Sequence, residues 1–546
     1  ELFWERASAV EPNYGAPASS TEEAARSICR RLDGLPLAIE LAAAQVPVFT
    51  PQQIDARLGD RFGLLRAPAR GRRDRHAALE TALGWSYDLL EPAERILLDR
   101  LAVFRGRFGV EDVEHVVTEV AVSREAVPDL LSRLVRKSLV VSEPAGEQRH
   151  YRLLESMREY ASARLIAAGE LDRWRERHFV WIMDLLEHAA DGLNSGEQAR
   201  WFATLDEQLA NVEAGFEWGL RRADHAARAL AAVQGLRNYW MAGGIRRGNG
   251  LRWLHATADA ASSIGPATRT RALVDAVLLL TLDDFGSARS LAEAARSIAG
   301  DDALAGAYAA LACAVVSVHG GVGGAGAEAG QAIAALPADD PLHWWARSMF
   351  ALDLARRGHS AVAAEQLRGA ADGFRSLGDE HLADGTLSYV ADLDLASGDR
   401  VAARAEASRA LATARRYECL SCECQALVEL TLADDVNPPP DRLGQLQRAL
   451  QLANAIGETW NILGGLDVIA AAFADVGRLS DAVTVAAAAR ALRAESGLAP
   501  VLPVRGSERE RALATARRSL DPGLISDLET QGARLDYLAA IDLALS

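Results

Sequence analysis

The sequence predicts a mainly α-helical protein in which two small domains precede a superhelix of helix-pair repeats. Alanine is abundant, and aromatic residues make up only 6% of the 546 residues, a composition that favours helix over sheet. One short hairpin pattern interrupts the helical periodicity near residue 145. Beyond residue 264, turn signals recur every 37–40 residues, which is typical of helix-pair repeats.

The charge is unevenly distributed along the chain. The net charge is −16, with about −2 in residues 1–180 and about −14 in the remainder. An acidic C-terminal part repels phosphate backbones, so we expect it to bind nucleic acid poorly. The longest apolar stretch, residues 272–282, is too short to cross a membrane. Five sparse cysteines indicate a reducing compartment, and we expect a cytoplasmic protein.

The first 70 residues predict a tail and a small helical domain. Ser20 to Glu23 form a capping-box pattern that begins a helix, and Gly34 ends it. Pro36 suits the first turn of a second helix, and Thr50 starts a third that we expect to reach about residue 65. We assign 19–70 to a helical domain and 1–18 to a linker or the tail of a preceding domain, because Glu1 begins inside a helix-like pattern and suggests a fragment.

The next segment has the element order of a winged helix. Helical patterns cover 77–89, 92–104 and 127–136. Two β-rich runs, 138–142 and 149–153, then flank a turn-forming segment, and a helix follows over 155–167. We assign 71–171 to this domain.

The remaining chain is helical throughout. Residues 172–264 form a predicted connector, and 265–546 form tetratricopeptide-like repeats. The turn residues that separate the repeats are Asp284, Gly321, Gly358, Gly398, Asn437 and Gly477.

Several ordered motifs resemble one known family. The run 30–44, RRLDGLPLAIELAAA, resembles the helical-domain signature of bacterial STAND proteins, the signal-transduction ATPases with numerous domains. The resemblance continues through 85–90, 137–140 and 151–161, and it is dense over about 1–255. In this family, NB-ARC-like helical and winged-helix domains follow a P-loop domain that binds ADP or ATP, and many members regulate transcription.

The P-loop motif itself is absent from this sequence. Its lysine must follow a glycine-rich loop to reach the phosphates, whereas Lys137, the only lysine, follows Leu134, Val135 and Arg136. We therefore expect no enzymatic activity and no bound cofactor in this chain, with ATP or ADP bound only by the full-length parent through a P-loop domain supplied in cis.

Two elements are candidate nucleotide-contacting sites by resemblance. Gly34, Leu35 and Pro36 match the family's G-x-P element, which closes over the bound nucleotide; the alternative is that they merely join two helices. Glu155 lies where relatives outside bacteria carry the acid of a Met-His-Asp sensor, but Leu154 replaces the histidine. Its alternative role is that of an acid favoured by the helix dipole.

Other features favour structural interpretations. The predicted recognition segment, 129–136, has mixed charge, so we expect DNA contact only through a domain outside this chain and keep direct binding as a weaker alternative. The basic run Arg70, Arg72, Arg73 and Arg75 is best explained as a solvated linker. No residues have the spacing of a catalytic constellation.

The closely spaced cysteines Cys419, Cys422 and Cys424 resemble a set of metal ligands. Zinc prefers four ligands, and no second Cys or His pair lies nearby in sequence. We therefore predict no metal site and interpret these residues as buried thiols, with metal binding left open.

The predicted role is the regulatory and sensor part of a STAND-type switch. The repeats would bind a protein or small-molecule inducer, no membrane would be involved, and activation could proceed through a homo-oligomer. The alternative is a nucleotide-independent protein-interaction scaffold.

Overall fold

The computed structural model describes most of the chain. The described residues are 2–10, 19–31, 39, 42–43, 46, 49–57, 87, 90–137, 139–145, 148–222, 224–242, 244–260 and 265–546. The chain forms two compact units: the first comprises 1–184 and 207–219, and the second comprises 185–206 and 220–546.

In its described N-terminal residues the first unit contains the short helices α1 (Leu2–Val10), α2 (Ser19–Arg31) and α4 (Pro51–Arg57). The start predicted at Thr50 is confirmed, because Thr50 and Gln53 form a reciprocal cap in which each backbone N–H donates to the other side chain, at 3.0 and 3.3 Å. Helix α2 packs on α4, where the Ser27 hydroxyl donates to Asp55 at 2.8 Å.

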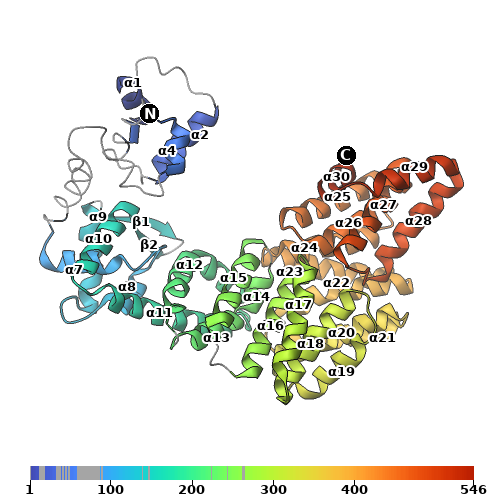
Figure 1. The fold of residues 1–546 in the computed structure, drawn as a ribbon, viewed down its shortest axis with the longest axis horizontal. Coiled ribbons are helices and arrows are strands. Elements are labelled where there is room, and N and C mark those ends of the chain that lie inside the picture. The colour runs from blue at the N-terminus through green and yellow to red at the C-terminus, as the bar shows by residue number, and fades with distance from the viewer. Residues whose placement is uncertain are drawn as a thin grey trace. The chain divides into compact units, whose positions relative to one another are not determined.

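The winged helix follows in the same unit (Figure 1). Its elements are α7 (Pro92–Leu101), α8 (Val110–Val117), the 3-10 turn η2 (Arg124–Ala126), α9 (Val127–Arg136), β1 (Val140–Ala145), β2 (Gln148–Leu153) and α10 (Glu155–Ala167). The predicted hairpin is confirmed as an antiparallel pair with Val140 opposite Leu153. Phe108 extends it, since its backbone exchanges hydrogen bonds of 2.9 and 2.8 Å with Tyr151.

Two details of this domain differ from the prediction. Helix α7 ends at Leu101 instead of residue 104. Helix α8 was missed because its β-branched valines weaken the local helical signal. The side chain of Asp112, in its first turn, accepts the Gly109 N–H at 2.6 Å, and Val113, Val116 and Val117 are fully buried in the shared core. The helix predicted over 77–89 lies, except for Tyr87, outside the described residues.

Two long helices, α11 (Leu171–Gly192) and α12 (Gln198–Gly219), contribute residues to both units. Within the first unit, the Asn211 side chain accepts the backbone N–H groups of Arg105 and Gly106 at 2.9 and 3.0 Å. The Arg100 guanidinium lies 4.1 Å from the ring centre of the buried Trp174. These contacts fix α11 and α12 against the winged helix.

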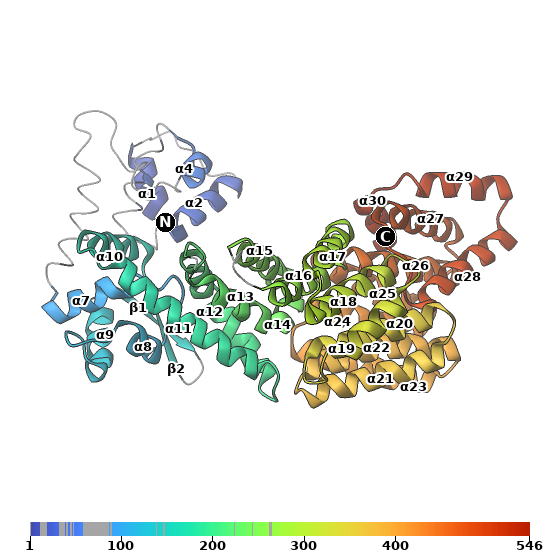
Figure 2. The same cartoon turned by 60° about the horizontal axis from the view of Figure 1, so that its bottom comes forward.

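The second unit is a superhelix of paired helices, drawn from green to red in Figures 1 and 2. Its helices are α13 (Ala226–Gly235), α14 (Arg237–Met241), α15 (Gly244–Ala260), α16 (Pro266–Leu280), α17 (Phe285–Ala299), α18 (Ala303–His319), α19 (Ala325–Ala335), α20 (Pro341–Arg356), α21 (Ser360–Ser376), α22 (Glu380–Ser397), α23 (Arg400–Arg416), α24 (Leu420–Leu432), α25 (Pro439–Ala455), α26 (Thr459–Asp475), α27 (Leu479–Ser496), α28 (Pro503–Ser519), α29 (Pro522–Gly532) and α30 (Tyr537–Leu545).

The predicted repeat boundaries coincide with the observed turns. Asp284 caps α17 by accepting the Ser287 N–H at 3.0 Å, and the glycines at 321, 358, 398 and 477 adopt positive φ in the turns between successive helix pairs. Glycine is favoured there because it has no Cβ to clash in the left-handed region. The fold class is therefore confirmed: mainly α, with a winged helix and a tetratricopeptide-like superhelix.

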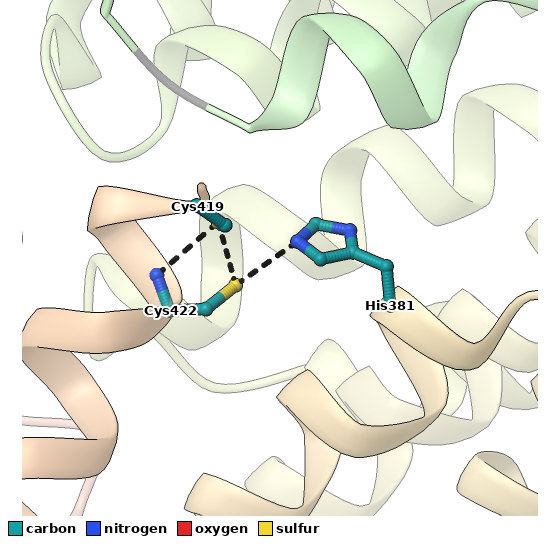
Figure 3. Close-up of side chains that lie close together, drawn as sticks. All are labelled: His381, Cys419 and Cys422. Atoms are coloured by element: carbon teal, nitrogen blue, oxygen red, sulfur yellow. Dashed lines mark hydrogen bonds between the residues drawn. The ribbon is translucent and has the colours of Figure 1, made fainter. Parts of the chain in front are cut away.

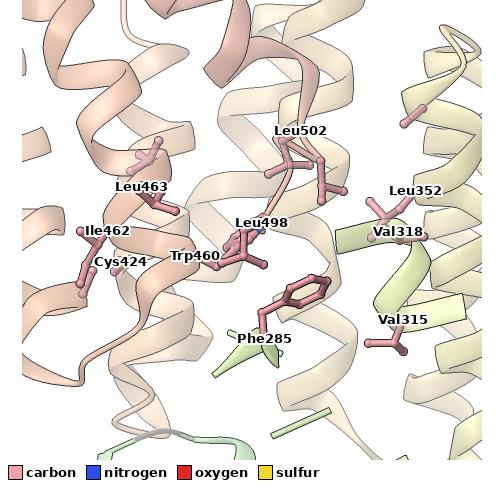
Figure 4. Close-up of a cluster of buried hydrophobic side chains, with 14 of the residues drawn as sticks. Phe285, Val315, Val318, Leu352, Cys424, Trp460, Ile462, Leu463, Leu498 and Leu502 are labelled. Atoms are coloured by element: carbon pink, nitrogen blue, oxygen red, sulfur yellow. The ribbon is translucent and has the colours of Figure 1, made fainter. Parts of the chain in front are cut away.

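The superhelix closes on itself. The N–H of Trp460, on α26, donates to the carbonyl of Leu282 beside α17 at 3.0 Å, and the N–H of Ala499 donates to His319 at 2.6 Å. Figure 4 shows Phe285, Trp460 and Leu498 together in the hydrophobic cluster at this closure. The first and last repeats thus share one core.

Among the described residues, no helix is both long enough and apolar enough to span a bilayer.

Candidate functional site

Of the residues predicted to contact nucleotide, the structure describes only Glu155. Gly34, Leu35 and Pro36 lie outside the described residues, as does the basic run at 70–75. Glu155 begins α10, where it forms an ion pair with Arg158. This placement suits an acid in the first turn of a helix, and its role toward nucleotide stays a prediction.

The third helix of the winged helix, α9, presents few free cations. Arg133 pairs with Asp129 at 2.7 Å, and Lys137 pairs with the buried carboxylate of Glu94. Burial alone would raise the pKa of Glu94, but hydrogen bonds from Lys137 and from the Glu91 N–H outweigh it and lower that pKa. Arg133 and Lys137, which could otherwise contact a phosphate backbone, are therefore already paired with carboxylates.

Charged side chains on the wing, which is the β1–β2 hairpin, are also paired with one another. Glu143 on β1 accepts Arg152 and Arg107, each at 2.8 Å. Across residues 90–166 there are 12 lysines and arginines and 13 aspartates and glutamates. This near-neutral balance contrasts with the net basic charge that is typical of DNA-reading domains.

The second unit contains an inner cavity of about 90 Å³ between the helices of the superhelix. Its lining comes from α14, α16, α18, α20, α21, α22, α24 and α26, and mixes apolar side chains with polar and aromatic ones. The groups able to hydrogen-bond or stack there include Thr281, His319, His381, Thr386, Tyr389, Gln425, Trp460 and Asn461. An apolar lining with a few converging polar groups is typical of small-molecule sites, but such sites usually measure about 300–1,000 Å³, so this cavity as it stands has room only for a very small ligand.

A buried ion network adjoins the cavity. Arg247 pairs with Glu458 and, at 2.8 Å, with Asp283. Glu458 also accepts the Ser421 hydroxyl at 2.7 Å and the Asn461 amide at 2.5 Å. Residues from the beginning and the end of the superhelix therefore meet at one carboxylate.

A second buried network lies around Arg505 at the start of α28. Its guanidinium donates twice to Glu429, at 3.1 and 2.6 Å. Burial raises the pKa of both Glu429 and the neighbouring Asp392, and their mutual repulsion raises that of Asp392 further, against the opposing charge of Arg505. The positive charge of Arg505 therefore stabilises the ionised forms of two buried carboxyl groups, Glu429 and Asp392.

Two of the predicted cysteines form a cluster with a histidine that sequence reasoning missed (Figure 3). Cys419 Sγ and Cys422 Sγ lie 2.9 Å apart, and Cys422 Sγ lies 3.4 Å from Nε2 of His381. The hydrogen bond between the two sulfurs holds the pKa of the Cys419 thiol below its usual value despite burial. Cys424 points elsewhere, into the apolar core shown in Figure 4.

His381 escaped detection because it lies one repeat before the cysteines. The repeat period places residues near 381 beside those near 421, so the signal for this contact is the alignment of helix starts in successive repeats.

A polar groove of about 680 Å³ is also present in the second unit. It is lined by residues of α22 to α26 and α28, among them Arg400, Arg442 and Arg511 facing Asp475 and Glu508. Its alternating charges suit a polypeptide segment.

Comparisons with known proteins agree with this architecture. Residues 90–166 match the family described as the winged helix-turn-helix domain. A protein of Mycobacterium tuberculosis named "Putative HTH-type transcriptional regulator" is 36% identical over 288 residues, which cover 52% of this chain and 32% of that protein. Another, named an uncharacterized protein, is 39% identical over 173 residues, covering 32% of this chain and 44% of its own length. The chain therefore spans less than half the length of either relative.

The chain also has a similarity to a solved structure. It is the STAND protein with a tetratricopeptide repeat sensor from Pyrococcus horikoshii, with a TM-score of 0.49, 13% identity, and coverage of 94% of this chain and 74% of that one. The winged helix is identified by the family match over residues 90–166, and the repeats after it are identified by their successive helices. The chain thus carries a winged helix-turn-helix domain ahead of a tetratricopeptide-like superhelix, and part of it is similar to proteins named "Putative HTH-type transcriptional regulator".

Proposed function

We propose that this chain is the regulatory and sensor portion of a STAND-type switch in transcription regulation. In this scheme the superhelix binds an inducer or partner protein. The helical domain and winged helix control whether a P-loop domain elsewhere in the parent protein holds ADP or ATP. Nucleotide hydrolysis would occur in that P-loop domain, since this sequence contains no P-loop motif.

The inner cavity is the observation that supports this proposal most directly. Its walls come from helices far apart along the superhelix, including α16 and α26. A small molecule bound there would contact both sides of the closure at once. Its affinity would therefore differ between closed and open forms, and such differential affinity is what a ligand needs to shift a conformational equilibrium.

Nucleotide titration of the full-length parent tests the switch. We expect calorimetry to show ADP and ATP binding to the parent and none to this chain, with Pro36→Ala weakening the binding. Pro51→Ala, at another helix start, serves as the matched control and should leave the affinity unchanged. A parent protein that binds neither nucleotide would contradict the switch.

The alternative is a nucleotide-independent scaffold, which the polar groove between α22 and α28 favours. A scaffold would bind a partner protein equally with or without nucleotide in the parent. A partner affinity that changes with ADP and ATP would exclude it.

A further inference from the structure

The loops that begin the second helix of each pair follow one pattern. The residues capping α18, α20, α22, α24 and α26 are Asp302, Asp340, Asp379, Cys419 and Glu458. Four are acidic, and carboxylates favour helix N-termini. Cys419 alone replaces the acid, and a neutral thiol is a weak hydrogen-bond acceptor.

The residue before this cap is equally unusual. Gly378 and Gly457 precede the caps of α22 and α26 with positive φ, as expected for glycine. Glu418 adopts φ +52 at the corresponding position before Cys419, the only described residue other than glycine that does so. A residue with a side chain is strained in this region of φ. The loop therefore places Cys419 at the helix start at a cost in conformational energy at Glu418.

His381 lies opposite, in the first turn of α22. Its side chain is only 2% exposed, and among the described residues no hydrogen-bond partner meets its Nδ1. The imidazole packs edge-on against Phe202 and Tyr417, with centroids 6.0 and 5.7 Å away. Its Nε2 is directed at Cys422 Sγ, so the sulfur is its close polar neighbour.

We propose that His381, Cys419 and Cys422 form a Cys2His site for a thiophilic metal ion, with its fourth position open to the inner cavity. Thiolate and imidazole ligands together favour Zn(II) and Cu(I) over hard cations. His381 and Cys422 line the cavity, whereas Cys419 lies behind them and is fully buried. Three protein ligands and one open position are the arrangement of an accessible zinc site.

The distances suit this role after a small adjustment. Zinc–sulfur bonds of about 2.3 Å and zinc–nitrogen bonds of about 2.0 Å place tetrahedral ligand atoms roughly 3.5–3.8 Å apart. The separation between Cys422 Sγ and His381 Nε2, 3.4 Å, is already close to this range. The two sulfurs, at 2.9 Å, must separate by somewhat less than 1 Å, and Cys422 can turn toward the cavity.

A dithiol switch is the competing interpretation, because Cys419-Leu420-Ser421-Cys422 is a C-x-x-C motif at a helix start. The buried imidazole favours the metal site, because it supplies a third ligand that disulfide formation does not use. The metal site does not depend on the proposed function, since ion binding requires no nucleotide.

Metal titration of the reduced full chain tests the proposal. After chelator treatment, the protein is loaded with Zn(II), or anaerobically with Cu(I), and the bound ion is counted by mass spectrometry after gel filtration. We expect one ion per chain, and at least a roughly 100-fold loss of affinity in each of Cys419→Ser, Cys422→Ser and His381→Gln. Cys313→Ser, in helix α18 outside the cluster, is the control that should bind normally.

A second measurement on the unaltered chain avoids any folding defect in the variants. Bound ion should protect Cys419 and Cys422 from alkylation, whereas the half-buried Cys29 should react equally with and without metal. Failure of the reduced chain to bind either ion, equal alkylation of all three thiols, or a Cys419–Cys422 disulfide whose reduction yields no metal binding would overturn the proposal.

Discussion

Trp460 and Leu282 are joined by a backbone hydrogen bond of 3.0 Å, although almost 180 residues separate them in the chain. This bond connects the loop before α17 to the start of α26 and completes one closed turn of the superhelix. The indole of Trp460 also lies against the Arg505 guanidinium, at 5.2 Å from the ring centre. The inner cavity exists because these distant repeats meet.

The first prediction concerns Arg247, whose side chain is 4% exposed and pairs with the fully buried Glu458. Arg247→Met leaves that carboxylate without its cation, which typically costs about 3–5 kcal/mol. We expect faster hydrogen exchange of the α26 amides, because the closure opens more often. Arg296→Met removes a largely exposed pair with Glu328. It should change the free energy of opening that hydrogen exchange measures by less than about 1 kcal/mol. Equal effects in both variants would contradict a special role for the closure.

The second prediction compares two glycines of α15. A Cβ at Gly250 would lie 2.6 Å from the ring of the buried Trp240, whereas a Cβ at Gly248 would meet nothing within 4 Å. Gly248→Ala should therefore stabilise the helix by up to about 1 kcal/mol through helix propensity. Gly250→Ala should destabilise the protein despite the same gain, because Trp240 is held by its indole hydrogen bond to Val233 at 2.9 Å. Thermal unfolding that shifts upward for both variants would be the contrary result.

These examples show which features local sequence can specify. The repeats were predicted because their signals are local: turn residues, mostly glycine, recur at a nearly fixed spacing, and each is followed by an alanine-rich helix. The cluster of His381 with Cys419 and Cys422 was missed because superhelical stacking joins residues one repeat apart. Helix α8 was missed because its valines are stabilised by the core of the winged helix, which a local pattern does not contain. The winged-helix fold was still recoverable from the order of its helices and hairpin.

The third prediction concerns pH and His319, which is buried at the closure. Burial lowers its pKa to about 4, while its Nδ1 donates to the Val315 carbonyl at 2.8 Å. Below about pH 6.5 the unfolded chain takes up a proton at this histidine that the folded chain refuses. Stability is therefore lost as the pH falls from about 6.5 to about 4, by up to about 1.4 kcal/mol per pH unit.

The variant His319→Gln isolates this contribution. It removes the titration, so its stability should fall less steeply than that of the unaltered chain over this pH range, while the buried carboxyl groups contribute equally to both. His359→Gln, at an exposed position before α21, is the control and should keep the original slope. Denaturant unfolding at several pH values provides the measurement, and parallel curves for all three proteins would rule out His319 as the source.

The last prediction addresses the winged helix and DNA. Arg133 is already paired with Asp129, and Arg136 is exposed at the end of α9. If α9 read DNA, reversing both charges would weaken binding strongly and reduce its salt dependence, because each neutralised phosphate releases counterions. We expect instead that the double variant Arg133→Glu, Arg136→Glu changes DNA affinity no more than the double variant Arg517→Glu, Arg518→Glu on α28. Fluorescence anisotropy with a random duplex at two salt concentrations checks this. A selective loss in the α9 variant would assign DNA contact to this domain, in place of a role confined to the nucleotide switch.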